Sequence, residues 1–201
     1  LLSVGGMDNT SFSIISNAFL VKLTTNGNYV WHKTIPAGGY NYHSVCVDEN
    51  NVYLATQTNG TQNMNAGGTT FNVSTLNSSY DIILTKYRKD GMFVTAKAIG
   101  GCTNVDYARG LEVKNGKLVM FGAFTTGTCT PIVDMNGGAP SVTITSNIST
   151  KKDGFLALYD TNLVCQWAKA IGGPDVSDEV WGGTFDNTGN FLVSGQFCGT
   201  N

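Results

Sequence analysis

The chain has 201 residues with 41% apolar content and a net charge of −2, from 12 basic and 14 acidic residues. Only 13% of the residues are charged, against about 25% in an average soluble domain, and the 25 glycines exceed the usual share of about 7%. This composition excludes a basic nucleic-acid binder, an acidic disordered tail and a coiled coil, and no apolar run approaches the ~18 residues of a membrane-spanning helix.

The first four residues do not resemble a signal peptide, because they carry neither a charged start nor a long apolar core. Residues 2–5 (Leu-Ser-Val-Gly) are similar to residues 192–195 (Leu-Val-Ser-Gly). The chain starts and stops at the same point of an internal pattern, so we expect both ends to be cuts within a longer polypeptide.

Four short strand patterns recur three times along the chain. Each pattern has one copy per unit: residues 18–23, 82–87 and 154–159; residues 31–35, 95–101 and 167–173; residues 45–47, 111–113 and 183–185; and residues 51–55, 116–122 and 189–195. The offsets of about 64 to 73 residues identify a repeat protein. They divide one repeat domain, residues 1–201, into units of approximately 6–57, 58–124 and 125–197.

Tight-turn sequences separate these patterns. Asn-Gly occurs at residues 26–27 and 115–116, and Asp-Gly at residues 90–91. Both dipeptides supply the positive φ angles of hairpin turns, and no long stretch keeps the apolar period of a helix. We therefore predict an all-β fold.

Two connections are too long for plain turns and are rich in Asn, Thr and Gly. They cover residues 58–80 and 125–152. Connections of this length belong on one face of the fold. Residues 70–73 and 142–145 within them have the composition of short extra β-strands.

Many of the predicted strands are apolar on both faces. In residues 18–23, Phe19, Val21 and Leu23 alternate with the equally apolar Leu20. Strands of this kind are covered by a neighbouring layer on each side. Four-stranded antiparallel units stacked in this way are the blades of a β-propeller, which we predict here as three repeats.

The order of strands within a blade follows from the edge residues. Lys33, Lys97 and Lys169 occupy equivalent positions, and lysine on an exposed edge opposes edge-to-edge pairing. We therefore expect residues 31–35 to be outermost and residues 45–47 innermost. A closed propeller needs about four to eight blades, so three blades cannot close alone. We expect part of a larger propeller, and the alternatives are a six-bladed ring of two copies and an open stacked array.

The third unit carries the clearest family pattern. It reads Asp-Gly-Phe-Leu-Ala-Leu-Tyr-Asp at residues 153–160, Trp-Ala-Lys-Ala-Ile-Gly-Gly at 167–173 and Asp-Asn-Thr-Gly-Asn-Phe-Leu-Val-Ser-Gly-Gln-Phe at 186–197. This resembles the SBBP repeat, a β-propeller repeat of secreted and surface proteins. The first unit departs from it with Pro-Ala-Gly-Gly at residues 36–39, and the second has Thr95 in place of tryptophan. The resemblance implies an extracellular or cell-surface spacer or adhesin and brings no catalytic residues.

Five cysteines occur without any Cys-x-x-Cys pair, which argues against a zinc site. Cys102 and Cys129 fall in connections on the same face of a blade, and in a surface protein we expect them to form a disulfide. Cys46 and Cys165 lie in predicted strands and are expected to be buried free thiols. Any partner of Cys198 would lie beyond this chain.

The sequence contains no recognisable catalytic constellation. His32 aligns with Ala96 and Ala168, so the repeat does not require it, and His43 begins an inner strand where we expect a structural role. No nucleophile, phosphate-binding or dinucleotide motif occurs, and we interpret the Gly-Gly pairs as turns. We therefore expect a protein that is not an enzyme and that needs no cofactor.

Two further kinds of site carry little information. The Asp-rich turns at residues 48–50 and 186–189 offer oxygen ligands for Ca²⁺, but ordinary hairpin turns use the same residues. Five Asn-x-Ser/Thr sequons are candidate glycosylation sites: Asn9, Asn59, Asn72, Asn77 and Asn147. Chance predicts about four sequons at this composition, so they identify no modification by themselves.

The leading functional hypothesis is an extracellular, non-catalytic structural or adhesive module that mediates protein–protein assembly on a cell surface or in a filament. Its partners would be further blades of the same polypeptide, identical subunits or other surface proteins. The alternative is a carbohydrate-binding propeller, in which Tyr40, Tyr42, Trp181 and Asp178 hold a glycan. A propeller enzyme would need catalytic groups converging on the central channel, and none recur there.

Overall fold

The computed structural model describes residues 2–3, 11–12, 18–38, 42–76, 79–101, 105–125, 133–146, 151–174 and 177–198. Within these residues the regular elements are β-strands, and the strand pairs are antiparallel. The all-β prediction is therefore confirmed. Over the same residues, no helix has the length and apolar content of a membrane span.

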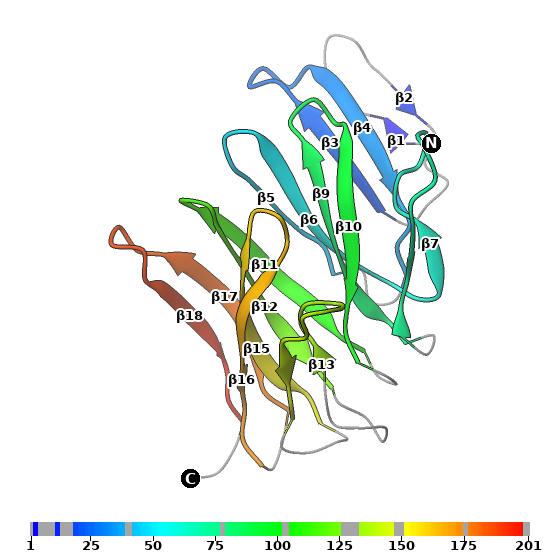
Figure 1. Cartoon of the computed structure of the whole chain (residues 1–201). Coiled ribbons are helices and arrows are strands. Elements are labelled where there is room, and N and C mark those ends of the chain that lie inside the picture. The colour runs from blue at the N-terminus through cyan, green and yellow to red at the C-terminus, as the bar shows by residue number, and fades with distance from the viewer. Residues whose placement is uncertain are drawn as a thin grey trace.

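Two four-stranded sheets form the centre of the molecule (Figure 1). The first full sheet has the order β5 (Ser44–Val47), β6 (Asn51–Thr58), β9 (Asp81–Arg88) and β10 (Phe93–Ile99). The second full sheet repeats this order with β11 (Tyr107–Lys114), β12 (Lys117–Phe124), β15 (Asp153–Asp160) and β16 (Cys165–Ile171).

A two-stranded hairpin lies against each end of this pair of sheets. The N-terminal hairpin consists of β3 (Ala18–Leu23) and β4 (Tyr29–Ile35), and the C-terminal hairpin of β17 (Glu179–Phe185) and β18 (Phe191–Gln196). By their place in the repeat, β3 and β4 are the third and fourth strands of a sheet, and β17 and β18 are the first and second. The four layers follow one another from the blue hairpin to the red hairpin in Figure 1.

The strand order agrees with the one predicted from the lysines. The sequence pattern expected innermost forms β5 and β11 at one sheet edge, and the pattern expected outermost forms β10 and β16 at the other. Four-stranded antiparallel units are thereby confirmed for the two full sheets. The described sheets do not close into a barrel or a ring, so the propeller remains a prediction.

Short strand pairs occupy the long connections, as expected for residues 70–73 and 142–145. The first connection contains β7 (Thr61–Asn63) paired with β8 (Asn72–Ser74), and the second contains β13 (Val133–Asp134) paired with β14 (Thr143–Ile144). Near the N-terminus, β1 (Leu2–Ser3) pairs with β2 (Ser11–Phe12).

Apolar side chains between the layers form the core. The cluster between the two full sheets includes Tyr53, Ile82, Leu84, Met120 and Phe155. The N-terminal hairpin adds Ala18 and Ile35 to a second cluster against the first full sheet. The C-terminal hairpin adds Val180 to a third cluster against the second full sheet. Layers on both sides explain why the strands are apolar on both faces.

The Gly-Gly motif after an outer strand is explained by two buried carboxyl groups. A Cβ at Gly100 would lie 2.6 Å from the carboxyl group of Asp81, so no larger residue fits there. The next residue, Gly101, donates its backbone N–H to Asp106 Oδ2 at 2.9 Å, and the Thr125 N–H donates to Asp106 Oδ1 at 3.0 Å. Asp106 thereby ties the segment after β10 to the segment after β12.

The next unit repeats this arrangement. The Gly173 N–H donates to Asp178 Oδ2 at 2.7 Å, and the Cys198 N–H donates to Asp178 Oδ1 at 2.9 Å. A Cβ at Gly172 would overlap the carboxyl group of Asp153. The Gly-Gly pairs are therefore one half of a glycine–aspartate framework, which their interpretation as simple turns did not include.

Candidate functional site

The starts of neighbouring inner strands bring together a group of aromatic and charged side chains. We call it the inner-strand cluster, and its members are Tyr42, Tyr107, Arg109, Lys152, Glu179 and Trp181. Tyr42 lies just before β5, Tyr107 and Arg109 on β11, and Glu179 and Trp181 on β17. These three inner strands follow one another in the stack, because β11 contacts both β5 and β17.

Arg109 lies at the centre of the aromatic side chains. Its guanidinium carbon is 4.4 Å from the ring centroid of Tyr42, 4.9 Å from that of Trp181 and 5.1 Å from that of Tyr107. The rings of Tyr42 and Tyr107 stack with their centroids 4.2 Å apart. These distances are those of cation–π contacts, which fix the orientation of the rings as well as the arginine.

Glu179 provides the counter-charge of the cluster. Arg109 Nη2 lies 2.7 Å from Glu179 Oε2, the Tyr107 hydroxyl donates to Glu179 Oε1, and Lys152 Nζ lies 3.7 Å from Oε1. Burial alone would raise the pKa of Glu179, but the hydrogen bonds from Tyr107 and Arg109 outweigh it and hold the pKa below its ordinary value. Glu179 is therefore ionised at neutral pH and positions Arg109.

Two of the residues predicted to bind a glycan meet in this cluster. Tyr42 and Trp181 both contact Arg109, and the indole of Trp181 is exposed. Asp178 does not join them, because its carboxyl group is buried and accepts the two backbone N–H groups of the framework described above. Tyr40 lies outside the described residues.

Three members of the cluster have no signal in the sequence that identifies them as site residues. Tyr107, Arg109 and Glu179 lie outside the inner-strand patterns that the sequence shows at residues 111–113 and 183–185. The repeat alignment places Arg109 at the position of Trp181, and this equivalence of an arginine with an exposed aromatic is the one available hint. Their proximity depends on the stacking of successive layers, which the sequence does not specify.

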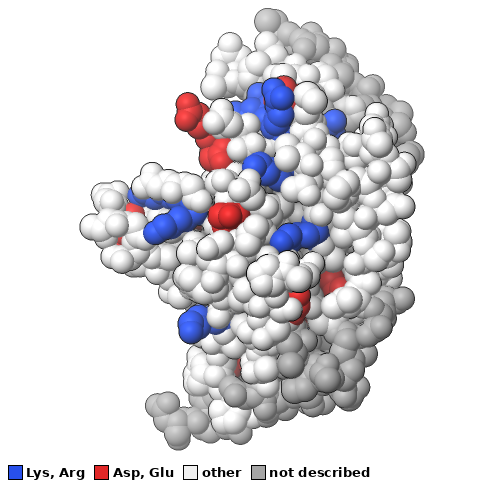
Figure 2. Space-filling view, viewed as in Figure 1, with Lys and Arg blue, Asp and Glu red and all other residues white. Residues whose placement is uncertain are grey.

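The surface beside Trp181 is an open depression. Trp181 lines a surface depression of about 300 Å³ together with Ser194, Gly195 and Gln196. An exposed indole stacks on the apolar face of a sugar ring, and hydroxyl and amide groups nearby hydrogen-bond its edge. Charged side chains are few and scattered on the face shown in Figure 2, so this chain offers no broad charged surface there.

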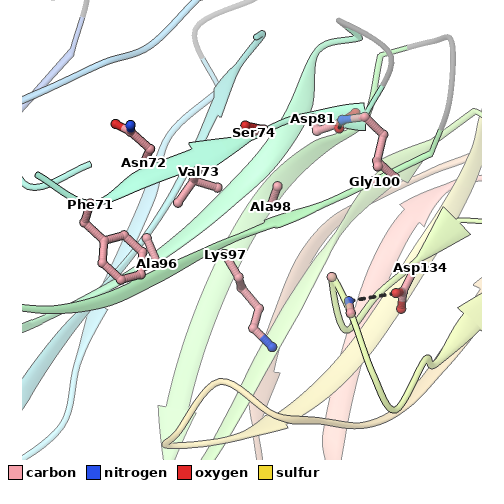
Figure 3. Close-up of a pocket in the computed structure, with 13 residues that line it drawn as sticks. Phe71, Asn72, Val73, Ser74, Asp81, Ala96, Lys97, Ala98, Gly100 and Asp134 are labelled. Carbon is pink, nitrogen blue, oxygen red and sulfur yellow. Dashed lines mark hydrogen bonds between the residues drawn. The ribbon is translucent and has the colours of Figure 1, made fainter. Parts of the chain in front are cut away.

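A larger cleft lies along β10, the outer strand of the first full sheet, between β8 and the residues around β13 (Figure 3). Its volume is about 500 Å³, and its lining includes Phe71, Val73, Asp81, Lys97, Gly100 and Asp134. The charged groups drawn there are already engaged within the protein. Lys97 Nζ donates to the carbonyl and amide oxygens of Asn136 at 2.8 and 3.0 Å, and Asp134 accepts the Gly138 N–H at 2.9 Å.

Asp81 is a buried titratable group in the lining of this cleft. Burial raises its pKa to about 6, although hydrogen bonds from Ser79 and from the Leu76 N–H act in the opposite direction. Its carboxyl group is committed to those partners and to the close approach of Gly100. The cleft is therefore large enough for a small molecule, but its charged groups are bound to other parts of the protein and do not indicate a particular ligand.

The cysteines that the structure describes are free thiols. Cys165 is buried, as predicted, whereas Cys46, which was also predicted to be buried, is half-buried, and Cys198 is exposed. Burial raises the pKa of the Cys46 thiol to about 12, which makes it a poor nucleophile. Cys102 and Cys129, the predicted disulfide pair, lie outside the described residues.

The histidines and the sequons are placed as follows. His32 Nδ1 lies 2.9 Å from the Tyr29 hydroxyl, and desolvation lowers the pKa of His43. Asn59 and Asn72 are exposed, and the three other sequon residues lie outside the described residues: Asn9, Asn77 and Asn147.

The Asp-rich turns use their carboxylates as hairpin turns do. Asp48 Oδ1 accepts the N–H groups of Asn50 and Asn51 at 2.8 and 2.7 Å, and Asp186 Oδ1 accepts those of Thr188 and Asn190 at 2.8 Å each. Over the part of the chain that the structure describes, no group of three His, Cys, Asp or Glu side chains is arranged to hold a metal ion.

Comparison with known proteins adds no assignment, because no protein-family model and no curated protein matches this sequence. The resemblance to the SBBP repeat therefore stays a prediction from the residues themselves.

Proposed function

We propose that this chain is a non-catalytic, extracellular structural module, built of β-propeller blades, that mediates protein–protein assembly on a cell surface or in a filament. One observation carries the proposal. Two four-stranded antiparallel sheets stack face to face and bury a shared apolar cluster between them, which is how the blades of a propeller assemble.

The surface composition supports the same proposal. Large apolar side chains are exposed on several strands, among them Phe19 and Leu23 on β3, Trp167 on β16 and Leu192 on β18. Clusters of exposed apolar side chains are typical of protein–protein contact sites. An extracellular setting follows from the resemblance to the SBBP repeat and from the Asn-, Thr- and Gly-rich loops with little charge.

The assembly function is tested by sedimentation velocity over a wide concentration range, followed by electron microscopy. We expect concentration-dependent growth into rings or linear stacks. A chain that stays monomeric at every concentration contradicts the proposal. So does the discovery of a catalytic turnover that is lost when Arg109 or Glu179 is replaced.

The inner-strand cluster favours carbohydrate binding as a second candidate function. The specific observation is that Tyr42 and Trp181 both lie on Arg109 and that the indole of Trp181 faces solvent. A glycan array probed with the wild-type chain and with Trp181→Ala tests it. Met92→Ala is the control, because Met92 is equally exposed but lies in the remote β9–β10 turn. Binding lost in Trp181→Ala alone supports this function, and an array without hits removes it.

A further inference from the structure

We propose that Lys97 and Asn136 of this chain join through an isopeptide bond between the lysine Nζ and the asparagine Cγ, with release of ammonia. The bond connects β10 of the first full sheet to the turn between β13 and β14 in the next unit. It is a covalent modification within one chain, so its test is independent of the assembly function proposed above.

The two reacting side chains are already in contact. Lys97 Nζ lies 3.0 Å from Asn136 Oδ1 and 2.8 Å from the Asn136 main-chain oxygen. The lysine side chain extends from β10 toward the segment that carries Asp134 (Figure 3). Because Oδ1 is bonded to Cγ, a rotation of the lysine side chain brings Nζ onto the carbonyl carbon. Groups that a fold holds this close react as if they were present at very high concentration.

The amide group of Asn136 is held in one orientation. The residue is only 3% exposed. Its Oδ1 also accepts the backbone N–H of Cys165 at 2.9 Å, and its Nδ2 donates to the Pro140 carbonyl oxygen at 2.7 Å. The Cys165 N–H therefore stabilises the negative charge that develops on Oδ1 when the amine attacks.

The turn that carries Asn136 is fixed on β10. Asp134 Oδ1 accepts the Asn136 N–H at 2.9 Å, and Asp134 Oδ2 accepts the Gly138 N–H at 2.9 Å. A Cβ at Gly137 would overlap the carbonyl oxygen of Ala98, so the turn lies directly against the strand that holds Lys97. The contact between the two side chains therefore depends on a defined backbone rather than on two mobile surface groups.

The surroundings of Lys97 favour the neutral amine, which is the nucleophilic form. Desolvation lowers the pKa of Lys97, and the acidic groups of Cys165, Asp134 and Asp160 oppose this effect only in part. A lysine that has lost part of its hydration is a better nucleophile at neutral pH than an exposed one, because more of it is unprotonated.

The reaction is balanced without a further reagent. The Lys97 ammonium loses one proton to solvent in the cleft that it lines. The neutral Nζ then forms a bond to Cγ of Asn136, and the electron pair of the carbonyl moves onto Oδ1. One proton of Nζ passes to Nδ2, the Cγ–Nδ2 bond breaks as the carbonyl forms again, and ammonia leaves. The product is a secondary amide, so no oxidant or reductant takes part.

The first unit contains an equivalent pair that lacks this geometry. Lys33 and Asn65 line one surface depression together. Asn65 is half-buried and its Nδ2 donates to the Thr69 carbonyl oxygen at 2.8 Å, and the structure gives no hydrogen bond between Lys33 and Asn65, both of which it describes. We therefore expect no bond at this pair, which makes Lys33 the matched control for Lys97.

The bond has a mechanical consequence for the fold. The turn at Asn136 is hydrogen-bonded to Cys165 at the start of β16, so the bond ties the outer strands of the two full sheets to each other. It also closes a covalent loop through β11 and β12, which restricts the unfolded chain as a disulfide does.

Mass spectrometry of the intact, denatured and reduced wild-type chain tests the proposal. We expect its mass to be lower than that of its sequence by one ammonia. Trypsin should then release residues 90–109 and 118–151 as one branched product, because it does not cleave after an acylated Lys97. The thiols are reduced and alkylated first, since Cys102 and Cys129 lie in the same two peptides. Fragmentation of the branched product assigns the bond to Lys97 and Asn136.

Two lysine variants identify the source of the lost ammonia. Lys97→Arg keeps the positive charge but removes the nucleophilic amine, because the guanidinium stays protonated. We expect this variant to have the full mass of its sequence. Lys33→Arg makes the same change at the control pair and should keep the loss of one ammonia. Circular dichroism verifies that both variants are folded.

Three results would overturn the isopeptide bond. The first is a wild-type chain that has the full mass of its sequence. The second is a loss of ammonia that persists in Lys97→Arg, since ring closure of Asn136 onto the backbone nitrogen of Gly137 releases ammonia without any lysine. The third is a loss that disappears in Lys33→Arg and persists in Lys97→Arg, which assigns the bond to the other pair. The branched peptide of the wild-type chain decides between these results even where a variant fails to fold.

Discussion

Replacement of Asp106 by asparagine removes a titratable group from the glycine–aspartate framework and preserves its shape. The Asp106 side chain is fully buried and accepts the N–H groups of Gly101 and Thr125. Burial raises its pKa to about 8, and the two hydrogen bonds, which favour the ionised form, only partly oppose this effect. Asp106 is therefore largely protonated in the folded chain at neutral pH.

The sign and size of the effect follow from linkage. In the unfolded chain the carboxyl pKa is about 3.9, so the folded state binds the proton more tightly. Such a group contributes its full stabilisation below about pH 4, and the contribution is lost as the pH rises through about 8. With a folded pKa of about 8, the free energy of unfolding falls by about 1 kcal/mol between pH 7 and pH 8.

The asparagine of Asp106→Asn has no proton to lose, so the variant should not show this decline. It lacks one of two acceptor oxygens, which costs about 1–3 kcal/mol at lower pH.

Urea unfolding of the wild-type chain and Asp106→Asn at several pH values between about 6 and 8.5 measures both effects. The window above pH 7 is chosen because Asp81, with a pKa of about 6, and His43, with a pKa lowered from 6.5, have finished titrating there. Asp178→Asn is the matched control for the lost hydrogen bond, since Asp178 accepts two backbone N–H groups in the same way. A wild-type stability that is constant or rises from pH 7 to 8.5 refutes the reasoning, as does an equal decline in Asp106→Asn.

Three further substitutions test the packing between layers. Tyr159→Phe removes a buried hydroxyl that donates to the Met135 carbonyl oxygen at 2.7 Å, and should lower the free energy of unfolding by about 1–2 kcal/mol. The repeat-equivalent Tyr87→Phe, whose hydroxyl is 3.5 Å from the Met64 carbonyl oxygen, should cost less than about 0.5 kcal/mol, and urea unfolding of both compares them. Gly122→Ala places a Cβ on the carbonyl oxygen at the start of β11 and should cost about 2–4 kcal/mol, so an unchanged thermal midpoint would contradict this close approach.

The strand order could be predicted from the sequence because each unit of the repeat has a lysine in the strand that lies at the edge of its sheet. Lys33, Lys97 and Lys169 recur at one position, and the strands that hold them lie at the outer edge of their sheets. The short strands in the long connections were predictable from β-branched residues alone. Both predictions depend on local composition and on periodicity, which a single sequence displays directly.

The glycine–aspartate framework was not predicted, although its residues recur. Gly101 and Asp106 are near each other in the chain, but the framework also needs Asp81 from β9 and the Thr125 N–H that follows β12. From the sequence alone, Gly-Gly is interpreted as a turn, because glycine adopts backbone angles that other residues avoid. Here the glycines are needed because neighbouring carboxyl groups occupy the space of a side chain.

The inner-strand cluster could be predicted only in part. The aromatic character of Tyr42 and Trp181 and their place at strand starts indicated contact residues, and the structure brings both onto Arg109. Asp178 was also predicted to be a contact residue, but its carboxyl group accepts two backbone N–H groups and is therefore not free to bind a ligand. Whether a polar side chain faces solvent or closes a turn depends on contacts between layers.

The contacts between layers also match the size of one residue to that of its neighbour. The interface between the N-terminal hairpin and the first full sheet places Trp31 against Gly91, and the interface between the full sheets has Thr95 and the buried Leu163 at the positions equivalent in the repeat. A large residue on one layer therefore goes with a small residue on the other, so that the space between the layers stays filled. A single sequence does not show this match, because the two positions lie in different units of the repeat.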